Sequence, residues 1–461
     1  MNPARLARRA WPALIVILTL WPALMVLLEW RNVDVLDFDA AVPDSDLVVY
    51  AGRAGTLAVL ALSGFVLLFG PLKRSTDLSH RNRARPVLIA LIIFLLGHNL
   101  VPAMFGAVPR LEISTLYAFM VLFAAYAARQ MPVDRFLNAL KISLLVLMVA
   151  GLVIVAIAPA IALQYVSADL RLPIIGFRFW GLGSNPNNVA PLALVLLMLT
   201  VHTPFNSRVV TLLSYASGMV TLILAQSQTT WVAALLVLPL YALYCRTPKP
   251  IRKARINPLM AIGVMLGLAI GLMLIIWEAA NFDFNDLTAT GNRGASSSLI
   301  NADPGFDSGT FTGRGQIWEV AIQTWKDHPI FGYGPTAWDL DFREMIGLSF
   351  AYNAHNQVMQ SVSVGGWVAL VSLLIYLLAL MRASLRTRRE HAGLALGLLT
   401  ILIIRGFTEG PLDTNTLFSG EVLLHTALLH LLFNGLAVGK TASVSRRRTR
   451  RHARQASMVN A

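Results

Sequence analysis

The sequence is poor in cysteine and in charge. Its one cysteine, Cys245, excludes an intrachain disulfide and a site built from several thiolates. Charged residues make up only 13% of the 461 residues, whereas soluble domains average about 25%. These shortages exclude an ordinary cytosolic enzyme, a disordered chain and a disulfide-stapled secreted module.

Apolar sequence is abundant instead, at 56% of all residues. A bilayer core about 30 Å thick requires roughly 20 consecutive apolar residues, and this length identifies twelve candidate spans. They cover 11–28, 49–70, 87–105, 111–128, 139–160, 188–202, 208–226, 230–245, 257–277, 356–381, 392–408 and 417–436. The pattern predicts an all-α, polytopic membrane protein with a large outward loop that contains short helices.

The distribution of charge predicts the orientation. A net charge of +14 would suit a nucleic-acid-binding protein only if it formed a basic face on a soluble fold. Here the basic residues gather in alternate short connections, at 73–85, 246–255 and 382–389, while the first outward connection at 34–46 is acidic. By the positive-inside rule, both termini are expected to be cytoplasmic. The first span lacks a cleavage signal and is expected to remain as an anchor.

Four regions follow from this topology. Residues 1–277 hold spans 1 to 9 with an outward motif loop at 161–187, and residues 278–355 form a large extracytoplasmic loop. Residues 356–439 hold spans 10 to 12. Residues 440–461 are rich in arginine and are expected to be a disordered cytoplasmic tail that contacts anionic lipids rather than nucleic acid.

Within the large loop, the apolar residues of 316–327 recur at helical spacing and predict an amphipathic helix at the membrane surface. Pro329 is expected to end this helix, and a glycine-bracketed turn follows at 331–335. A second short helix is predicted around 338–345. The loop returns to the membrane at His355.

The same loop contains the most specific motifs of the chain. They read TGRGQIW at 312–318, HPIFGYG at 328–334 and AHN at 354–356, followed by Gly365-Gly366. Together they resemble the signature loop of the O-antigen ligase and Wzy-type polymerase superfamily. Its members are polytopic enzymes that transfer glycans from a polyprenyl-diphosphate carrier outside the bacterial inner membrane.

Two further segments carry the resemblance. The sequence RFWGLGSNPNNVA at 178–190 is similar to the superfamily's Arg…Gly…Pro-Asn…Ala segment, and RGFTE at 405–409 is a shorter match. The chain departs from the ligases at Ala369, where they carry a second glycine, and at Gln228, where many members carry arginine. The loop motifs look most like those of exopolysaccharide polymerases.

The chemistry of this transfer favours particular residue types. A leaving diphosphate suits arginine, which binds phosphate with a planar fork, and an acceptor hydroxyl suits a histidine that exchanges protons near neutral pH. The resemblance implies Arg178 and Arg314 as the diphosphate-binding arginines and His355 as the essential histidine, with Asn356 binding sugar or orienting the loop. Arg171 could share or replace the role of Arg178.

Other residues allow two interpretations. Arg405 and Glu409 are expected to bind substrate or to form a structural ion pair at a helix end. Trp318 and Tyr333 are expected to stack on sugars or to belong to an aromatic belt at the membrane interface. The intramembrane pair His98-Asn99 is functional by default, but an interhelical hydrogen bond would explain it equally well.

The resemblance implies a polymerase of undecaprenyl-diphosphate-linked repeat units, with its active site outside the inner membrane. A ligase that delivers the glycan to lipid A core or another acceptor is the first alternative, and a flippase for the lipid-linked oligosaccharide is the second. The implied partners are the glycan donor, the glycan acceptor, membrane lipids and other assembly proteins such as a flippase and a chain-length regulator. No Walker-type pattern occurs, and the reaction is expected to need no metal and no cofactor.

Overall fold

We describe a computed structural model of residues 2–29, 46–70, 78–111, 113–165, 177–244, 314–348, 351–388, 390–391, 393–414 and 416–438. The described chain is mostly helical, as predicted. Span 9, the segment 278–313, Arg171 and the basic tail lie outside the described residues. Every other predicted span contains a described helix.

The first half of the described chain is a series of helices around one short hairpin. The helices are α1 (Pro3–Glu29), α2 (Asp46–Phe69), α3 (Leu78–Leu95), the π-helix η1 (Leu96–Leu100), α4 (Val101–Phe105), α5 (Thr115–Ala127), η2 (Ala128–Gln130), α6 (Val133–Ile157) and α7 (Pro159–Ala162). Strands β1 (Leu163–Tyr165) and β2 (Phe177–Phe179) pair antiparallel, with Gln164 opposite Arg178. This hairpin lies in the predicted outward motif loop.

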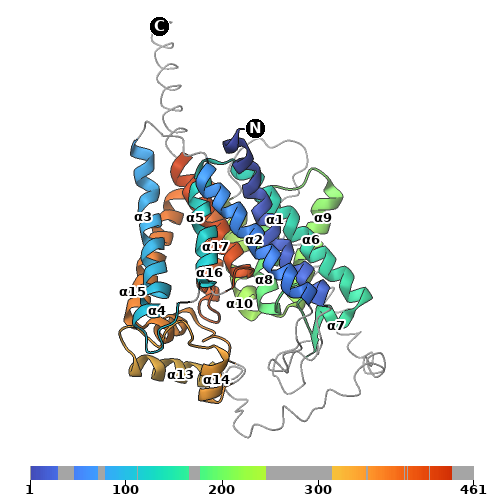
Figure 1. The fold of residues 1–461 in the computed structure, drawn as a ribbon. Coiled ribbons are helices and arrows are strands. Elements are labelled where there is room, and N and C mark those ends of the chain that lie inside the picture. Colours follow the sequence, from blue (N-terminus) through green and yellow to red (C-terminus); the bar gives the residue numbers. More distant parts are fainter. Residues whose placement is uncertain are drawn as a thin grey trace, which may run out of the picture.

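The second half continues with α8 (Pro186–His202), α9 (Arg208–Leu224), α10 (Gln228–Tyr244), α13 (Arg314–Asp327), α14 (Leu340–Ile346), α15 (Gln357–Thr387), α16 (Leu394–Arg405) and α17 (Gly420–Val438). Helices α13 and α14 confirm the two helices predicted in the large loop. Both lie at the end of the bundle opposite the start of α1 (Figure 1).

Six described helical segments are long and apolar enough to cross a membrane. They are Pro3–Leu28, Asp46–Phe69, Arg83–Phe105, Val133–Ile157, Gln357–Thr387 and Gly420–Ala437. The other helices in predicted spans, α5, α8, α9, α10 and α16, have only 12 to 17 residues. The structure therefore supports a membrane protein, while the count of twelve crossings stays a prediction.

The core of the bundle is formed by α8 and α17. Of the most apolar window of α17, 83% is buried, and this helix packs against α3, α5, α8, α15 and α16. Nearly every residue of α8 from Pro186 to Thr200 is buried as well. A helix that is apolar all round is expected at such a central position.

Helix α15 is interrupted at Gly365 and Gly366, whose backbone angles are not helical. The loop after α13 fills this break. The backbone N–H groups of Trp367 and Val368 donate to the carbonyls of Pro329 and Ile330, and those of Tyr333 and Gly334 donate to the carbonyls of Ser363 and Val364. The interrupted helix thus keeps its polar backbone groups satisfied, as an apolar environment requires, and fixes α13 and α14 to the bundle.

Candidate active site

Glu409 is the centre of a cluster of polar side chains from five segments. Its carboxylate accepts a hydrogen bond from Asn187 Nδ2 at 2.8 Å, lies 3.1 Å from His355 Nδ1 and lies 3.5 Å from Arg314 Nη2. Asn187 in turn accepts a hydrogen bond from Arg178 Nη2 at 2.7 Å. We call Arg178, Asn187, Arg314, His355 and Glu409 the candidate active site.

The turn before α15 positions His355. Asn353 Oδ1 accepts a 2.7 Å hydrogen bond from the His355 N–H, and Trp318 Nε1 of α13 donates to the carbonyl of Ala354 at 3.0 Å. His355 adopts a left-handed backbone with φ 46°, which is uncommon for a residue with a side chain and is often found at functional sites. Its imidazole is 14% exposed, so the histidine is largely enclosed but reachable.

Asn356 caps α15. Its side-chain oxygen accepts hydrogen bonds from the N–H groups of Val358 and Met359, as an N-cap does. Its Nδ2 donates to the carbonyl of Phe407 at 3.2 Å, and the next N–H, of Gln357, donates to Gly406 O at 2.8 Å. These bonds join the start of α15 to the end of α16 and bring Glu409 to His355.

Arg178 enters the site from the short hairpin. Its Nε donates to the carbonyl of Ala225 at 3.2 Å, beyond the end of α9. Burial lowers the pKa of this guanidinium, Glu409 raises it and Arg314 lowers it, with a net decrease. The two arginines therefore face the same carboxylate and repel each other, an arrangement that favours the entry of an anion.

The pKa of Glu409 responds to opposing effects. Burial raises the pKa, but the hydrogen bond and the charge of His355, followed by the charges of Arg405 and Arg314, reduce it below its ordinary value. Glu409 is therefore a carboxylate at neutral pH. A carboxylate against Nδ1 favours the tautomer in which Nδ1 carries the proton and Nε2 can accept one.

Arg405 and Glu409 do not form the ion pair that was one interpretation of the sequence. The buried Arg405 Nη2 lies 2.6 Å from Glu421 Oε1 of α17. Its guanidinium also donates to Asn187 O at 2.7 Å and to Asn188 Oδ1 at 3.2 Å. Arg405 therefore fixes the start of α8, which carries Asn187. It supports the position of a candidate active-site residue and is not itself a member of the candidate active site.

The aromatic candidates lie beside the site. Trp318 and Tyr333 are half-buried and pack against the cluster formed by α13, α14 and the turn before α15. Tyr352 is different, because 47% of it is exposed and its ring centre lies 5.2 Å from that of His355. Stacking of Trp318 and Tyr333 on sugars stays a prediction.

His98 and Asn99 lie in η1, which packs against α15. The His98 ring lies 5.0 Å from that of Phe94. His98 Nε2 and Asn99 Oδ1 are buried and make no hydrogen bond with the described residues. The expected interhelical hydrogen bond is therefore not observed at these two atoms in the described part of the chain.

An apolar groove lies between α15 and α16. It has a volume of about 130 Å³, and its polar lining residues, Asn356 and Gln357, follow His355 directly in the chain; Phe407 also lines it. The remaining lining is Val358, Leu373, Leu377, Leu380, Leu399, Leu402, Ile403, Gly406, Pro411 and Leu412. A groove with this lining suits a short part of a hydrocarbon chain, next to a polar group at the candidate active site.

Sequence reasoning missed three residues of this arrangement. Asn187 lies nine positions after Arg178 within the motif at 178–190, and this shared motif was the available signal. Tyr352 is an aromatic residue three positions before His355. For Glu421, an acidic residue at the start of an apolar span was the only signal.

Comparison with known families gives a match that overlaps part of the candidate active site. Residues 212–374, about a third of the chain, match the family model described as O-antigen ligase. The match contains Arg314 and His355, while Arg178, Asn187 and Glu409 lie outside it. No curated protein matches the chain. The long apolar helices and this match together support a membrane protein with a region similar to the O-antigen ligase family.

Proposed function

We propose that the chain is a glycosyltransferase that polymerises polyprenyl-diphosphate-linked oligosaccharide repeat units. The observation that carries the proposal is the convergence of His355, Arg314 and, through Asn187, Arg178 on one carboxylate. This set supplies a proton acceptor and two cations within one small site.

In the proposed reaction, an acceptor hydroxyl attacks the anomeric carbon of the donor glycan. His355 Nε2 takes the hydroxyl proton while Glu409 holds Nδ1. The bond between the sugar and the diphosphate breaks, and Arg178 and Arg314 stabilise the negative charge on the leaving diphosphate. The products are an elongated glycan and free polyprenyl diphosphate.

The apolar groove supports a lipid-linked donor. Its lining includes Asn356, which directly follows His355, so the end of a polyprenyl chain held in the groove would place its diphosphate near the site. Since the arginines neutralise the leaving group, the proposed transfer requires no metal and no cofactor.

The proposed topology has twelve crossings and both termini in the cytoplasm. The motif loop at 161–187 and the large loop at 278–355 then face outward from the bacterial inner membrane, and residues 356–439 complete the bundle before the basic tail. Positive-inside charge and the six long apolar helices support this topology.

A ligase is the second candidate, because the matched family model is described as O-antigen ligase. The chemistry is then the same, but the acceptor is lipid A core or another surface molecule. Purified protein supplied with lipid-linked repeat units tests the choice. A ladder of lengthened products supports a polymerase, and a single transfer to added lipid A core supports a ligase. Movement of the lipid-linked repeat unit across a vesicle membrane without a new glycosidic bond would indicate a flippase, and would contradict both the polymerase and the ligase.

Replacement of His355 with alanine tests the proposed site in the same assay. We expect product formation to fall at least about 10²-fold, the lower range for loss of acid–base catalysis. His328→Ala is the matched control, because His328 is an exposed histidine that follows α13 and does not contact Glu409. Equal rates for the two variants would contradict the assignment of His355.

A further inference from the structure

The far end of α15 carries a second feature that the proposed transfer does not use. An open groove of about 740 Å³ lies there, and the described residues that line it are three arginines and three apolar residues. They are Leu378, Met381, Arg382, Leu385, Arg386 and Arg388. The spacing i, i+3, i+4, i+7, i+8 places the first five on one face of the helix.

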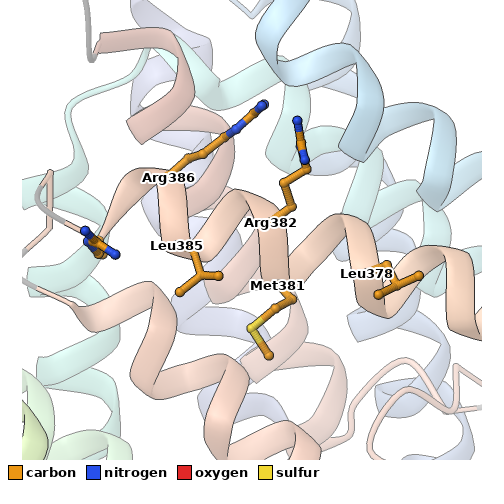
Figure 2. Close-up of a pocket in the computed structure, with 6 residues that line it drawn as sticks. Leu378, Met381, Arg382, Leu385 and Arg386 are labelled. Atoms are coloured by element: carbon orange, nitrogen blue, oxygen red, sulfur yellow. The ribbon is translucent and has the colours of Figure 1, made fainter.

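No described acidic residue pairs with the arginines of this groove. Arg382 and Arg386 are one helical turn apart, and their guanidinium groups extend in the same direction (Figure 2). Like charges at this spacing repel. Among the described residues, neither Arg382, Arg386 nor Arg388 forms an ion pair. An anion held between them would relieve the repulsion.

The apolar residues of the groove indicate the chemistry of the part of the ligand that is not anionic. Leu378 is 70% exposed and Leu385 is 45% exposed, and both lie on the same helix as the arginines (Figure 2). Exposed leucines on a membrane-crossing helix suit contact with acyl chains. A ligand with an anionic head and a hydrocarbon tail therefore matches the groove better than a free anion.

The depth of the groove agrees with a lipid headgroup. Arg382 follows Gln357 by 25 positions, for which the helical rise gives at most about 37 Å, because α15 is interrupted at Gly365 and Gly366. The bilayer core is about 30 Å thick, so the groove lies toward the opposite end of α15 from the candidate active site, at a distance comparable with that thickness. Arginine at this position also binds phosphate through a planar fork.

We propose that this groove is a binding site for an anionic phospholipid of the leaflet opposite the candidate active site. The headgroup phosphate lies between Arg382 and Arg386, and an acyl chain covers Leu378 and Leu385. The basic tail of the chain is a poor occupant, because its arginines would be repelled by those of the groove.

The test is native mass spectrometry of the full chain in nonionic detergent with added cardiolipin, phosphatidylglycerol or phosphatidylcholine. We expect the two anionic lipids to remain bound and phosphatidylcholine to be lost. The double variant Arg382→Gln/Arg386→Gln should retain at least tenfold less anionic lipid than the unchanged protein. Its matched control is Arg135→Gln/Arg208→Gln, which removes two exposed arginines from α6 and α9.

Three results would overturn the proposal. One is equal retention of phosphatidylcholine and the anionic lipids by the unchanged protein, which does not depend on any variant. Another is an equal loss of lipid in the two double variants, which would indicate a general effect of surface charge. The third is protection from thermal unfolding by inorganic phosphate as large as that by phosphatidylglycerol, which would indicate a site for free phosphate.

Discussion

Glu409 contacts three side chains on which the proposed transfer depends, and its charge is the property that matters most. Glu409→Gln keeps the size of the side chain but removes the charge opposite His355 and Arg314. We expect the rate of product formation to fall about 10²-fold, because the histidine loses its orienting carboxylate. Initial rates with purified protein measure this change. The control is Glu344→Gln, an exposed glutamate of α14, and a similar loss in both variants would refute the role of Glu409.

The same carboxylate predicts a pH dependence of stability. The pKa of Glu409 is below its ordinary value of 4.5 in the folded protein. The charged carboxylate therefore stabilises the fold above about pH 4.5. This stabilisation is lost as the pH falls through the lower pKa of the folded state. The thermal unfolding temperature of Glu409→Gln should therefore lie below that of the unchanged protein at pH 7, and the difference should shrink below pH 4.5. A difference that grows on acidification would contradict this sign.

Asn187 connects Arg178 to Glu409 through one amide. Asn187→Ala removes two hydrogen bonds to charged groups, each worth about 1.5–3 kcal/mol. We expect at least a tenfold loss in kcat/KM for the lipid-linked donor, with the protein still folded. Asn138→Ala, at an exposed asparagine of α6, is the control. An unchanged kcat/KM in Asn187→Ala would show that Arg178 does not need this contact.

At the scale of elements, the break in α15 explains why residue 366 is a glycine. The carbonyl oxygens of Pro329 and Ile330 would lie 2.4 Å and 2.6 Å from a Cβ at Gly366. Only glycine therefore allows the loop after α13 to approach α15 this closely. The sequence did not predict that α15 is interrupted here, because the break depends on hydrogen bonds to a loop that lies 30 to 38 positions earlier in the chain.

Gly366→Ala should therefore destabilise the protein strongly. Its φ of 57° disfavours a side chain, and a Cβ would meet backbone atoms that cannot move alone, so we expect a loss of about 2–4 kcal/mol. Gly347→Ala is a matched control, since Gly347 has a φ of 69° with nothing within 4 Å of a Cβ, and about 1 kcal/mol is expected. Thermal unfolding in detergent compares them, and equal effects would exclude a role for the close approach.

At the scale of the whole molecule, the orientation across the membrane can be tested with single cysteines. In a Cys245→Ser background, we expect Gln323→Cys on α13 to react with a membrane-impermeant maleimide in cells whose outer membrane alone has been permeabilised. Glu390→Cys, beyond α15, should react only after the inner membrane is opened, because the basic connections face the cytoplasm. Both residues are exposed, so access to the reagent decides the result. The reverse pattern would invert the proposed topology.

The sequence by itself determined the membrane character, the helices α13 and α14, and the motifs that carry Arg178, Arg314 and His355. These features depend on local composition, on helical periodicity and on short patterns, which can be read from adjacent residues. Only the tertiary structure decided that Glu409 faces His355 while Arg405 pairs with Glu421, because these partners come from segments that are distant in the chain. Hydrogen bonds between such segments depend on how α8, α15, α16 and α17 pack, and no single segment encodes that packing.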